Sequence, residues 1–196
     1  MSKKTIIIIV VIAIIGILAY TKYNGMVVLN EDAKTAWSNV ESEYQRRSDL
    51  IGSLVKTVKG AADFERTTLE AVIKARSEAT KTQINVDDLT PENMAKFQQA
   101  QSGLSGALSR LLVTVERYPE LKANENFLKL QDELASTENS VRTARNRFND
   151  AANDFNKNIK TFPNNMFAGM FGFSEMARFK AKPGSEEAPD TSFDFQ

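Results

Sequence analysis

Two polar clusters in this sequence have spacings that could support chemistry. Ser53 and Lys56 lie one helical turn apart, as in a serine–lysine dyad whose lysine accepts the serine proton. Asp63, Glu65 and Glu70 could serve as a carboxylate acid–base pair or as ligands of a hard metal ion. The sequence predicts neither the buried, neutral lysine that a dyad needs nor a further ligand that converges on the carboxylates. We interpret both clusters as solvated helix faces.

The composition also argues against catalysis. The 196 residues include no histidine and no cysteine, which removes the commonest general base, the commonest metal ligand and every thiol. Acidic and basic residues number 25 each, so no overall positive field attracts nucleic acid. Carboxylates, lysines, serines and tyrosines remain, and catalysis is disfavoured without being excluded. We predict a non-enzymatic protein with no cofactor, no metal ion, no small-molecule substrate and no nucleic-acid partner.

A third polar group lies within an apolar stripe. Arg46, Arg47 and Asp49 follow one another in QRRSDL, and Arg47 falls on the stripe itself. Its planar guanidinium could bind an anion or a partner's carboxylate. A polar residue in such a stripe more often fixes helix register by pairing with an acid on a neighbouring helix, and we favour that interpretation.

The N-terminal region predicts a membrane anchor. Residues 5–21 read TIIIIVVIAIIGILAYT, an apolar run of roughly 25 Å as a helix against a hydrocarbon core of about 30 Å. A cleaved signal peptide is the main alternative, but bulky Tyr20, Lys22 and Tyr23 interrupt the small residues that cleavage requires. The residues chosen to mark the anchor are Ile6, Ile9, Ile12, Ile15, Leu18 and Tyr20.

Flanking charges predict the orientation of this anchor. Lys3, Lys4 and the free amine precede the span, whereas Lys22 follows it and is succeeded by Glu31 and Asp32. Positive charge is retained in the cytoplasm. We therefore expect a single-pass membrane protein with its N-terminus in the cytoplasm and its helical body exported from it.

The rest of the chain predicts an all-α fold. Apolar residues recur at helical spacing over about 31–81, 91–118 and 124–163, and no segment alternates as a strand does. Three long helices with short links predict an up-down-up antiparallel bundle, with room for a short fourth helix. The predicted divisions are a cytoplasmic stub and anchor, a membrane-proximal stalk, the bundle, a Phe/Met-rich segment and a disordered acidic tail, over residues 1–23, 24–50, 51–163, 164–180 and 181–196 respectively.

Unequal helix lengths predict an exposed seam in the stalk. A first helix over 31–81 would extend about 75 Å, whereas the second would extend about 42 Å and could not return to the membrane. The stalk would then have no partner within the chain, and exposed apolar seams usually mark interfaces. We expect self-association into a homo-oligomer through Trp37, Val40 and Tyr44. The alternative is that the first helix breaks and this part packs on the bundle.

The segment after the third helix is apolar and nearly uncharged. The same three-helix arrangement predicts that it lies at the end of the bundle farthest from the membrane. It would either cap the open end of the core or bind a partner protein or another bilayer. Its marker residues are Phe167, Met170, Phe171, Phe173 and Met176.

Asparagines form a stripe of their own on the third helix, displaced from the core stripe. Glu and Lys favour helices more than Asn does, so a face that only meets solvent would more economically carry charges. We interpret the stripe as an amide-lined contact face for a neighbouring subunit or another helix, the alternative being a merely tolerated polar face. Its members are Asn139, Arg142, Asn146, Asn149, Asn153 and Asn156.

Long segments of the chain resemble the bacterial LemA family. They are YNGMV (23–27), AWSNVESEYQRRSDLIGSLVKTVKGAADFE (36–65), YPELKANENFLKLQDEL (118–134) and TENSVRTARNRFNDAANDFNKNIKTFP (137–163). The resemblance implies an all-helical envelope protein of the bacterial inner membrane, with an N-terminal anchor and a periplasmic or extracytoplasmic body, and it supplies no catalytic residues. Gly52 stands where members commonly carry proline, which implies a straighter first helix here.

These observations together predict a structural or scaffolding protein of the cell envelope that presents helical interaction surfaces. One alternative is an accessory subunit of an envelope enzyme such as a membrane protease, which could associate with other envelope proteins. Another is a membrane-shaping protein.

Overall fold

The chain folds almost entirely into helices. The computed structural model describes residues 2–60 and 64–181, and no strand occurs within these ranges. The all-α class predicted from the sequence is confirmed. The elements in chain order are α1 (Lys3–Lys59), α2 (Arg66–Lys81), the 3-10 turn η1 (Val86–Asp88), α3 (Pro91–Val115), α4 (Pro119–Lys122), α5 (Glu125–Lys160) and α6 (Asn164–Ala168).

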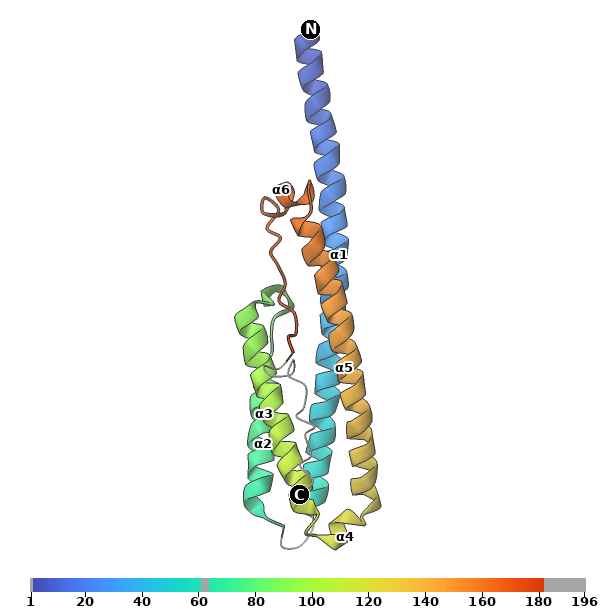
Figure 1. The fold of residues 1–196 in the computed structure, drawn as a ribbon, viewed down its shortest axis with the longest axis vertical. Helices are drawn as coiled ribbons and strands as arrows, with labels where there is room; N and C mark the ends of the chain where they lie inside the picture. Colours follow the sequence, from blue (N-terminus) through green and yellow to red (C-terminus); the bar gives the residue numbers. More distant parts are fainter. Residues whose placement is uncertain (1, 61–63, 182–196) are drawn as a thin grey trace, which may run out of the picture.

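The bundle has four long passes, α1, α2, α3 and α5, rather than the predicted three (Figure 1). The predicted helix over 31–81 ends at Lys59, where the Gly60 N–H bonds the Lys56 carbonyl at 3.2 Å. Glycine has a low helix propensity, and Gly60 is the residue that caps the end of α1. The apolar stripe resumes on α2, so its period could not distinguish one long helix from a hairpin.

The other helix starts agree with the sequence signals. The side chain of Thr90 accepts a hydrogen bond from the Asn93 N–H at 3.3 Å, and Pro91 is the first residue of α3. Asn124 caps α5 in the same way, accepting from the Phe127 N–H at 3.1 Å. These caps satisfy N–H groups that the first helical turn leaves unpaired.

The long helices α1 and α5 run antiparallel and pack along each other. α5 is about 54 Å long, enough to extend from the level of Lys59 back to the level of Tyr23. The ring of Tyr23 contacts Phe171, which follows α6, with centroids 4.9 Å apart. The residues after α5 therefore lie beside the anchor, at the membrane-proximal end.

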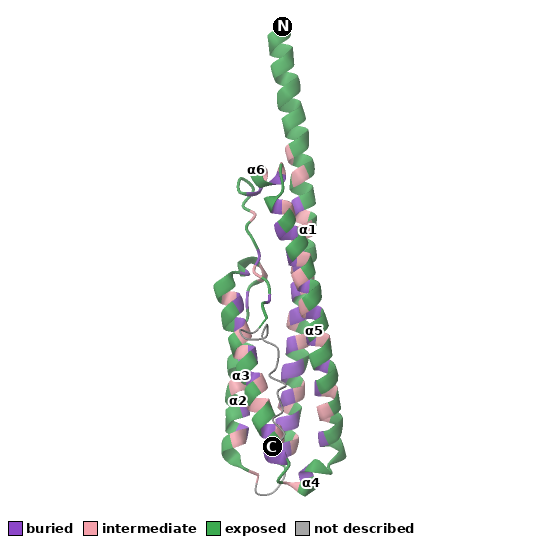
Figure 2. Ribbon diagram, viewed as in Figure 1, coloured by how far each residue is buried: buried purple, intermediate pink, exposed green. Residues whose placement is uncertain are grey.

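The hairpin of α2 and α3 covers only part of this pair. It stops well below the upper end of α5 (Figure 1), because α2 has 16 residues and α3 has 25. Buried residues line the inward faces of the helices, and the free part of α1 above them is exposed (Figure 2). The bundle thus has two ends of different construction.

The core consists of two clusters. The distal core, near the turns after α1 and α3, is mainly aliphatic and includes Ile51, Leu54, Val58, Val72, Leu104, Leu111 and Leu134. The proximal core, toward the anchor, is rich in aromatic residues and methionine and includes Met26, Trp37, Met94, Phe97, Phe148, Phe155, Met176 and Phe179.

Candidate functional site

An extended segment after α6 lies along the amide face of α5. We call residues 173–181 the C-terminal strap. Asn156 donates its amide N–H to the Met176 carbonyl at 2.8 Å and accepts from the Met176 N–H at 2.9 Å. Asn149 does the same for Phe179, at 3.1 and 2.9 Å. A primary amide carries a donor and an acceptor, so each asparagine pairs with the strap as a neighbouring peptide group would.

The spacing of the two asparagines matches the strap. Asn149 and Asn156 are seven residues apart, which is about 10.5 Å along a helix. Met176 and Phe179 are three residues apart, which is about 10 Å along an extended chain. The two amides therefore bind two strap peptides in register, with the strap antiparallel to α5. We call Asn149, Asn153 and Asn156 the amide clamp.

Further contacts attach the strap on both sides. Asn153 accepts a hydrogen bond from the Arg178 guanidinium at 2.8 Å. The Ala177 N–H donates to the Leu89 carbonyl at 2.8 Å, and Leu89 precedes α3. The strap thus links the α2–α3 hairpin to α5.

Strap side chains complete the proximal core. Met176 and Phe179 are buried. The Phe179 ring lies 5.9 Å from Trp37 and 5.8 Å from Phe148 between centroids, and the Arg145 guanidinium lies 4.4 Å from its centroid. Aromatic rings at these separations attract one another beyond their area of contact.

The predicted polar face therefore divides into two parts. Asn149, Asn153 and Asn156 hold an extended segment of the same chain, in place of the neighbouring subunit or helix that we expected. Asn139 and Arg142 bond each other at 3.0 Å on the surface. Asn146 is exposed. The sequence shows the periodicity of the asparagines, but it does not show which segment they hold.

The prediction of an exposed seam is wrong. Trp37 and Val40 are fully buried and Tyr44 is nearly so, because α5 returns beside α1 and α3 adds Phe97. Trp37 lies 5.1 Å from Phe148 and 5.5 Å from Phe97 between ring centroids. The error follows from counting three passes, which left residues 24–50 without a partner. Of the alternative, the packing of this part on the bundle is confirmed, whereas the helix does not break there, since α1 is continuous from Lys3 to Lys59.

The predicted location of the Phe/Met-rich segment is also wrong. It lies at the membrane-proximal end, because a fourth pass reverses the direction in which α5 arrives. Phe173 and Phe167 are half-buried and Met176 is buried in the proximal core. Met170 and Phe171 are exposed. The predicted acidic tail lies outside the described residues, apart from Ala181.

Arg47 has the role that we favoured. It is buried, with its guanidinium 3.5 Å from the Glu138 carboxylate on α5 and bonded to the Ser105 hydroxyl on α3. It thereby links three helices at one level. Of the other polar clusters, Ser53 donates to the Asp49 carbonyl at 3.1 Å rather than to a lysine. Asp63, of the predicted carboxylate cluster, lies outside the described residues, and among those described no group of three or more carboxylates could hold a metal ion.

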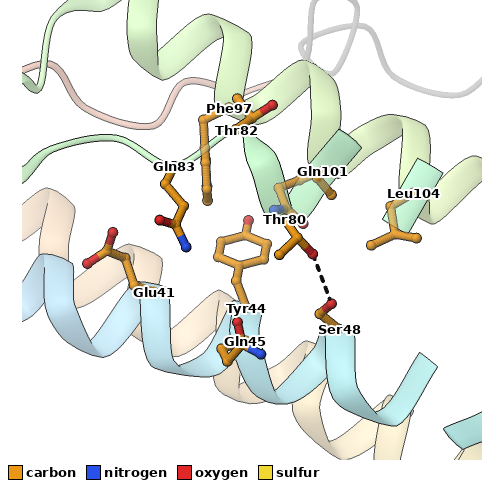
Figure 3. A pocket seen from close by; sticks show the side chains of 11 residues that line it. Glu41, Tyr44, Gln45, Ser48, Thr80, Thr82, Gln83, Phe97, Gln101 and Leu104 are labelled. Carbon is orange, nitrogen blue, oxygen red and sulfur yellow. Dashed lines mark hydrogen bonds between the residues drawn. The ribbon is translucent and has the colours of Figure 1, made fainter. Parts of the chain in front are cut away.

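A small cavity of about 50 Å³ lies between α1 and the α2–α3 hairpin. The side chain of Tyr44 points into it, and Glu41, Gln45, Gln83 and Gln101 add polar groups to its wall (Figure 3). Ser48 and Thr80 lie 3.3 Å apart beside it. The volume suits one or a few water molecules and is too small for a substrate.

Burial raises the pKa of the Glu41 carboxyl above its ordinary value, and the indole of Trp37 lowers it in part. The indole nitrogen nevertheless makes no hydrogen bond of normal length with any described residue. Burial also raises the pKa of Tyr44. Both raised pKa values have the same cause, since packing removes these groups from water and so disfavours their charged forms.

Above the bundle, α1 continues alone as an apolar helix. Its most apolar window has a mean hydropathy of 2.5, and none of it is buried in the protein. All six predicted anchor residues are in this free part. By length and composition it is the one helix in the described chain that could cross a membrane.

A family model described as LemA family matches residues 36–193. The chain belongs to the LemA family. In this LemA-family protein the match begins after the apolar span and includes the amide clamp and the strap. Family membership and the free apolar helix together indicate association with a membrane.

Comparison with individual proteins gives distant relatives. Magnetosome protein MamQ 2 of Paramagnetospirillum magneticum is 26% identical over 198 residues, covering 90% of this chain and 73% of the relative. Magnetosome protein MamQ of Magnetospirillum gryphiswaldense is 25% identical over 182 residues, covering 84% and 67%. Protein LemA of Metamycoplasma hominis is 25% identical over 161 residues, covering 82% and 70%.

Proposed function

We propose that this LemA-family protein is a non-enzymatic scaffold of the bacterial cell envelope. The observation that carries the proposal is the continuity of α1 from Lys3 to Lys59. One helix supplies both the apolar span and a long side of both cores, with Met26, Trp37 and Ile51 buried along it. Because α1 has no hinge, the direction of its apolar span fixes the direction of the part that lies in the bundle. The bundle is therefore held at a set angle to the anchor and presents its helical surfaces from there.

The flanking charges support an extracytoplasmic position for the bundle. Lys3 and Lys4 precede the span, and acidic residues follow soon after Lys22. By the positive-inside rule the short end stays in the cytoplasm of a single-pass inner-membrane protein.

The use of the polar groups supports a non-enzymatic role. Arg47 links three helices, Ser53 bonds its own helix, and the amide clamp holds the strap. The sequence contains no histidine or cysteine to act as base or nucleophile. The names of the three relatives mention no reaction. Trp37, Val40 and Tyr44 have no part in self-association in this proposal, since they form the core.

Cysteine labelling tests the topology directly, because the natural chain has no cysteine. We would introduce S2C before the span and, separately, G103C on α3, where an added Cβ meets no atom within 4 Å. In intact bacterial cells a membrane-impermeant maleimide should label G103C, and S2C only after permeabilisation. Equal labelling of both in intact cells would show that α1 does not separate them. The reverse pattern would place the bundle in the cytoplasm.

The scaffolding role needs a second test. A photocrosslinking amino acid at the exposed positions Val113 on α3 and Leu128 on α5 should give adducts of defined mass in native membranes. The buried position Leu104 serves as the matched control and should give none. If the exposed positions gave only the uncrosslinked chain under all growth conditions, a role in presenting surfaces would be contradicted.

A further inference from the structure

An exposed apolar surface lies at the membrane-proximal end of the bundle. Phe162, Met166 and Met170 follow one another at four-residue intervals, and their exposed fractions are 75%, 66% and 71%. They precede, belong to and follow α6, respectively. We call these three residues the apolar shoulder. No described residue covers it, and an apolar surface of this kind usually marks a contact.

The same segment has a buried side. Ala168 is buried and Phe167 is half-buried against the proximal core. The segment is thus apolar on both faces. One face packs against the bundle, and the other, which is the apolar shoulder, projects away from it. Packing within the chain explains the first face only.

The position of α6 along α1 indicates what the second face meets. Tyr23 contacts Phe171 and Phe173, with centroids 4.9 and 5.9 Å apart. Above α6, only the free part of α1 continues (Figure 1). The apolar run ends near residue 21, and Tyr23 is about 3 Å farther along the helix axis.

The length of the run places α6 at the membrane surface. Residues 5–21 extend about 25 Å, which is shorter than a hydrocarbon core of about 30 Å. The boundary between hydrocarbon and headgroups must therefore lie close to Tyr20 and Tyr23. Aromatic side chains are favoured at this depth. Because the segment around α6 packs on α1 at the same level, the shoulder is held close to this boundary.

We propose that the apolar shoulder inserts into the outer boundary layer of the same bilayer that α1 crosses. The occupant is lipid rather than another protein, because the shoulder lies beside the end of the apolar span, at a depth set by the packing of this segment on α1. This inference rests on the proposed anchoring by α1. Its consequence is a second membrane contact on one side of the anchor. A single helix alone leaves rotation and tilt open, whereas two contacts determine both.

Depth-dependent fluorescence quenching in the full-length chain tests this proposal. Single cysteines replace Met166 in the shoulder, Ile12 in the span and Val113 at an exposed distal position. Each variant carries a nitrobenzoxadiazole label and is reconstituted into phosphatidylcholine–phosphatidylglycerol vesicles that contain a shallow or a deep doxyl quencher. We expect M166C to be blue-shifted and quenched mainly by the shallow doxyl, I12C mainly by the deep one, and V113C by neither.

The controls separate this inference from the proposed function. If I12C is quenched and M166C is not, the shoulder does not meet lipid, and this inference alone is overturned. A blue shift of M166C without quenching would mean that protein covers the shoulder, which also overturns it. If I12C itself is not quenched, the anchoring by α1 is wrong. Adding F162S and M170S to M166C should remove its shallow quenching while helical circular dichroism stays unchanged.

Discussion

The two ends of the bundle bury their apolar residues in different ways. At the distal end, α1, α2, α3 and α5 are all present, and aliphatic residues such as Leu54, Leu104 and Leu111 fill the space between them. Toward the proximal end the hairpin ends while α1 and α5 continue (Figure 1). The strap packs there beside the start of α3, with Phe179 among Trp37, Phe97 and Phe148.

This difference has a physical reason. Four amphipathic helices bury one another's apolar stripes and bond their own backbones. An extended strap buries side chains well, but its peptide groups need external partners. The amide clamp supplies them through Asn149 and Asn156. A core built with an extended segment therefore requires polar residues beside it, whereas a core built from helices does not.

The largest effect is expected from W37A in the proximal core. The indole is fully buried against three aromatic rings. Truncation of a buried aromatic residue costs about 3–5 kcal/mol. The variant should lose about 4 kcal/mol of unfolding free energy in urea titrations followed by circular dichroism in detergent. Trypsin should also cut sooner in the strap, after Arg178 or Lys180. Unchanged stability with a changed oligomer mass would instead restore the seam hypothesis.

L54A makes the matching change in the distal core. Leu54 is fully buried among aliphatic residues. We expect a loss of about 3 kcal/mol from the lost apolar burial and the cavity that remains. The rate of tryptic cleavage in the strap under native conditions should stay unchanged, because the strap does not contact this cluster. Faster cleavage would show that the two ends open as one unit.

N156A tests the amide clamp without changing the apolar core. It leaves the buried N–H and C=O of Met176 without their partner. We expect a loss of about 2 kcal/mol, since an unsatisfied buried group costs about 1–3 kcal/mol. The exposed Asn146 on the same helix provides the control, and N146A should change the free energy by less than about 0.5 kcal/mol. Equal urea midpoints for the two variants would show that the clamp does not hold the strap.

The smallest effect concerns pH and Glu41. Burial raises the pKa of this carboxyl in the folded protein above its ordinary value of 4.5. The folded state therefore binds this proton more tightly than the unfolded state does. The free energy of unfolding that the bound proton contributes is present at low pH and is lost as the pH rises through the folded pKa. E41Q should be slightly more stable than the natural chain at neutral pH and indistinguishable from it below pH 4.5. The measurement is the urea midpoint across this range, and a constant difference would contradict it.

Local signals in the sequence were sufficient for several elements. The Thr90–Pro91 start of α3, the Asn124 cap of α5 and the apolar run of α1 are each determined by residues within a few positions of one another. Arg47 was interpreted as a register pair because an apolar stripe rarely tolerates an unpaired charge. The end of α1 at Lys59 was missed, because the apolar period continues with the same phase on α2.

That single missed turn explains the other errors. One additional pass reverses the direction of α5, which brings Phe171 beside Tyr23 and covers Trp37. The strap was missed for a different reason. Phe173, Met176 and Phe179 recur every three residues, a spacing that does not reveal an extended segment. Such a segment acquires its position only from the amides that bind its backbone.

The sequence by itself determined the helical class, the apolar span, the lack of histidine and cysteine, and the helical spacing of the asparagine stripe. These properties depend on composition and on spacing within one helix. Only the tertiary structure decided that the stripe holds the chain's own C-terminal strap and that the Phe/Met-rich segment lies beside the anchor. Both depend on how many times the chain reverses direction, and the reversal between Lys59 and Arg66 leaves the helical period on either side unchanged.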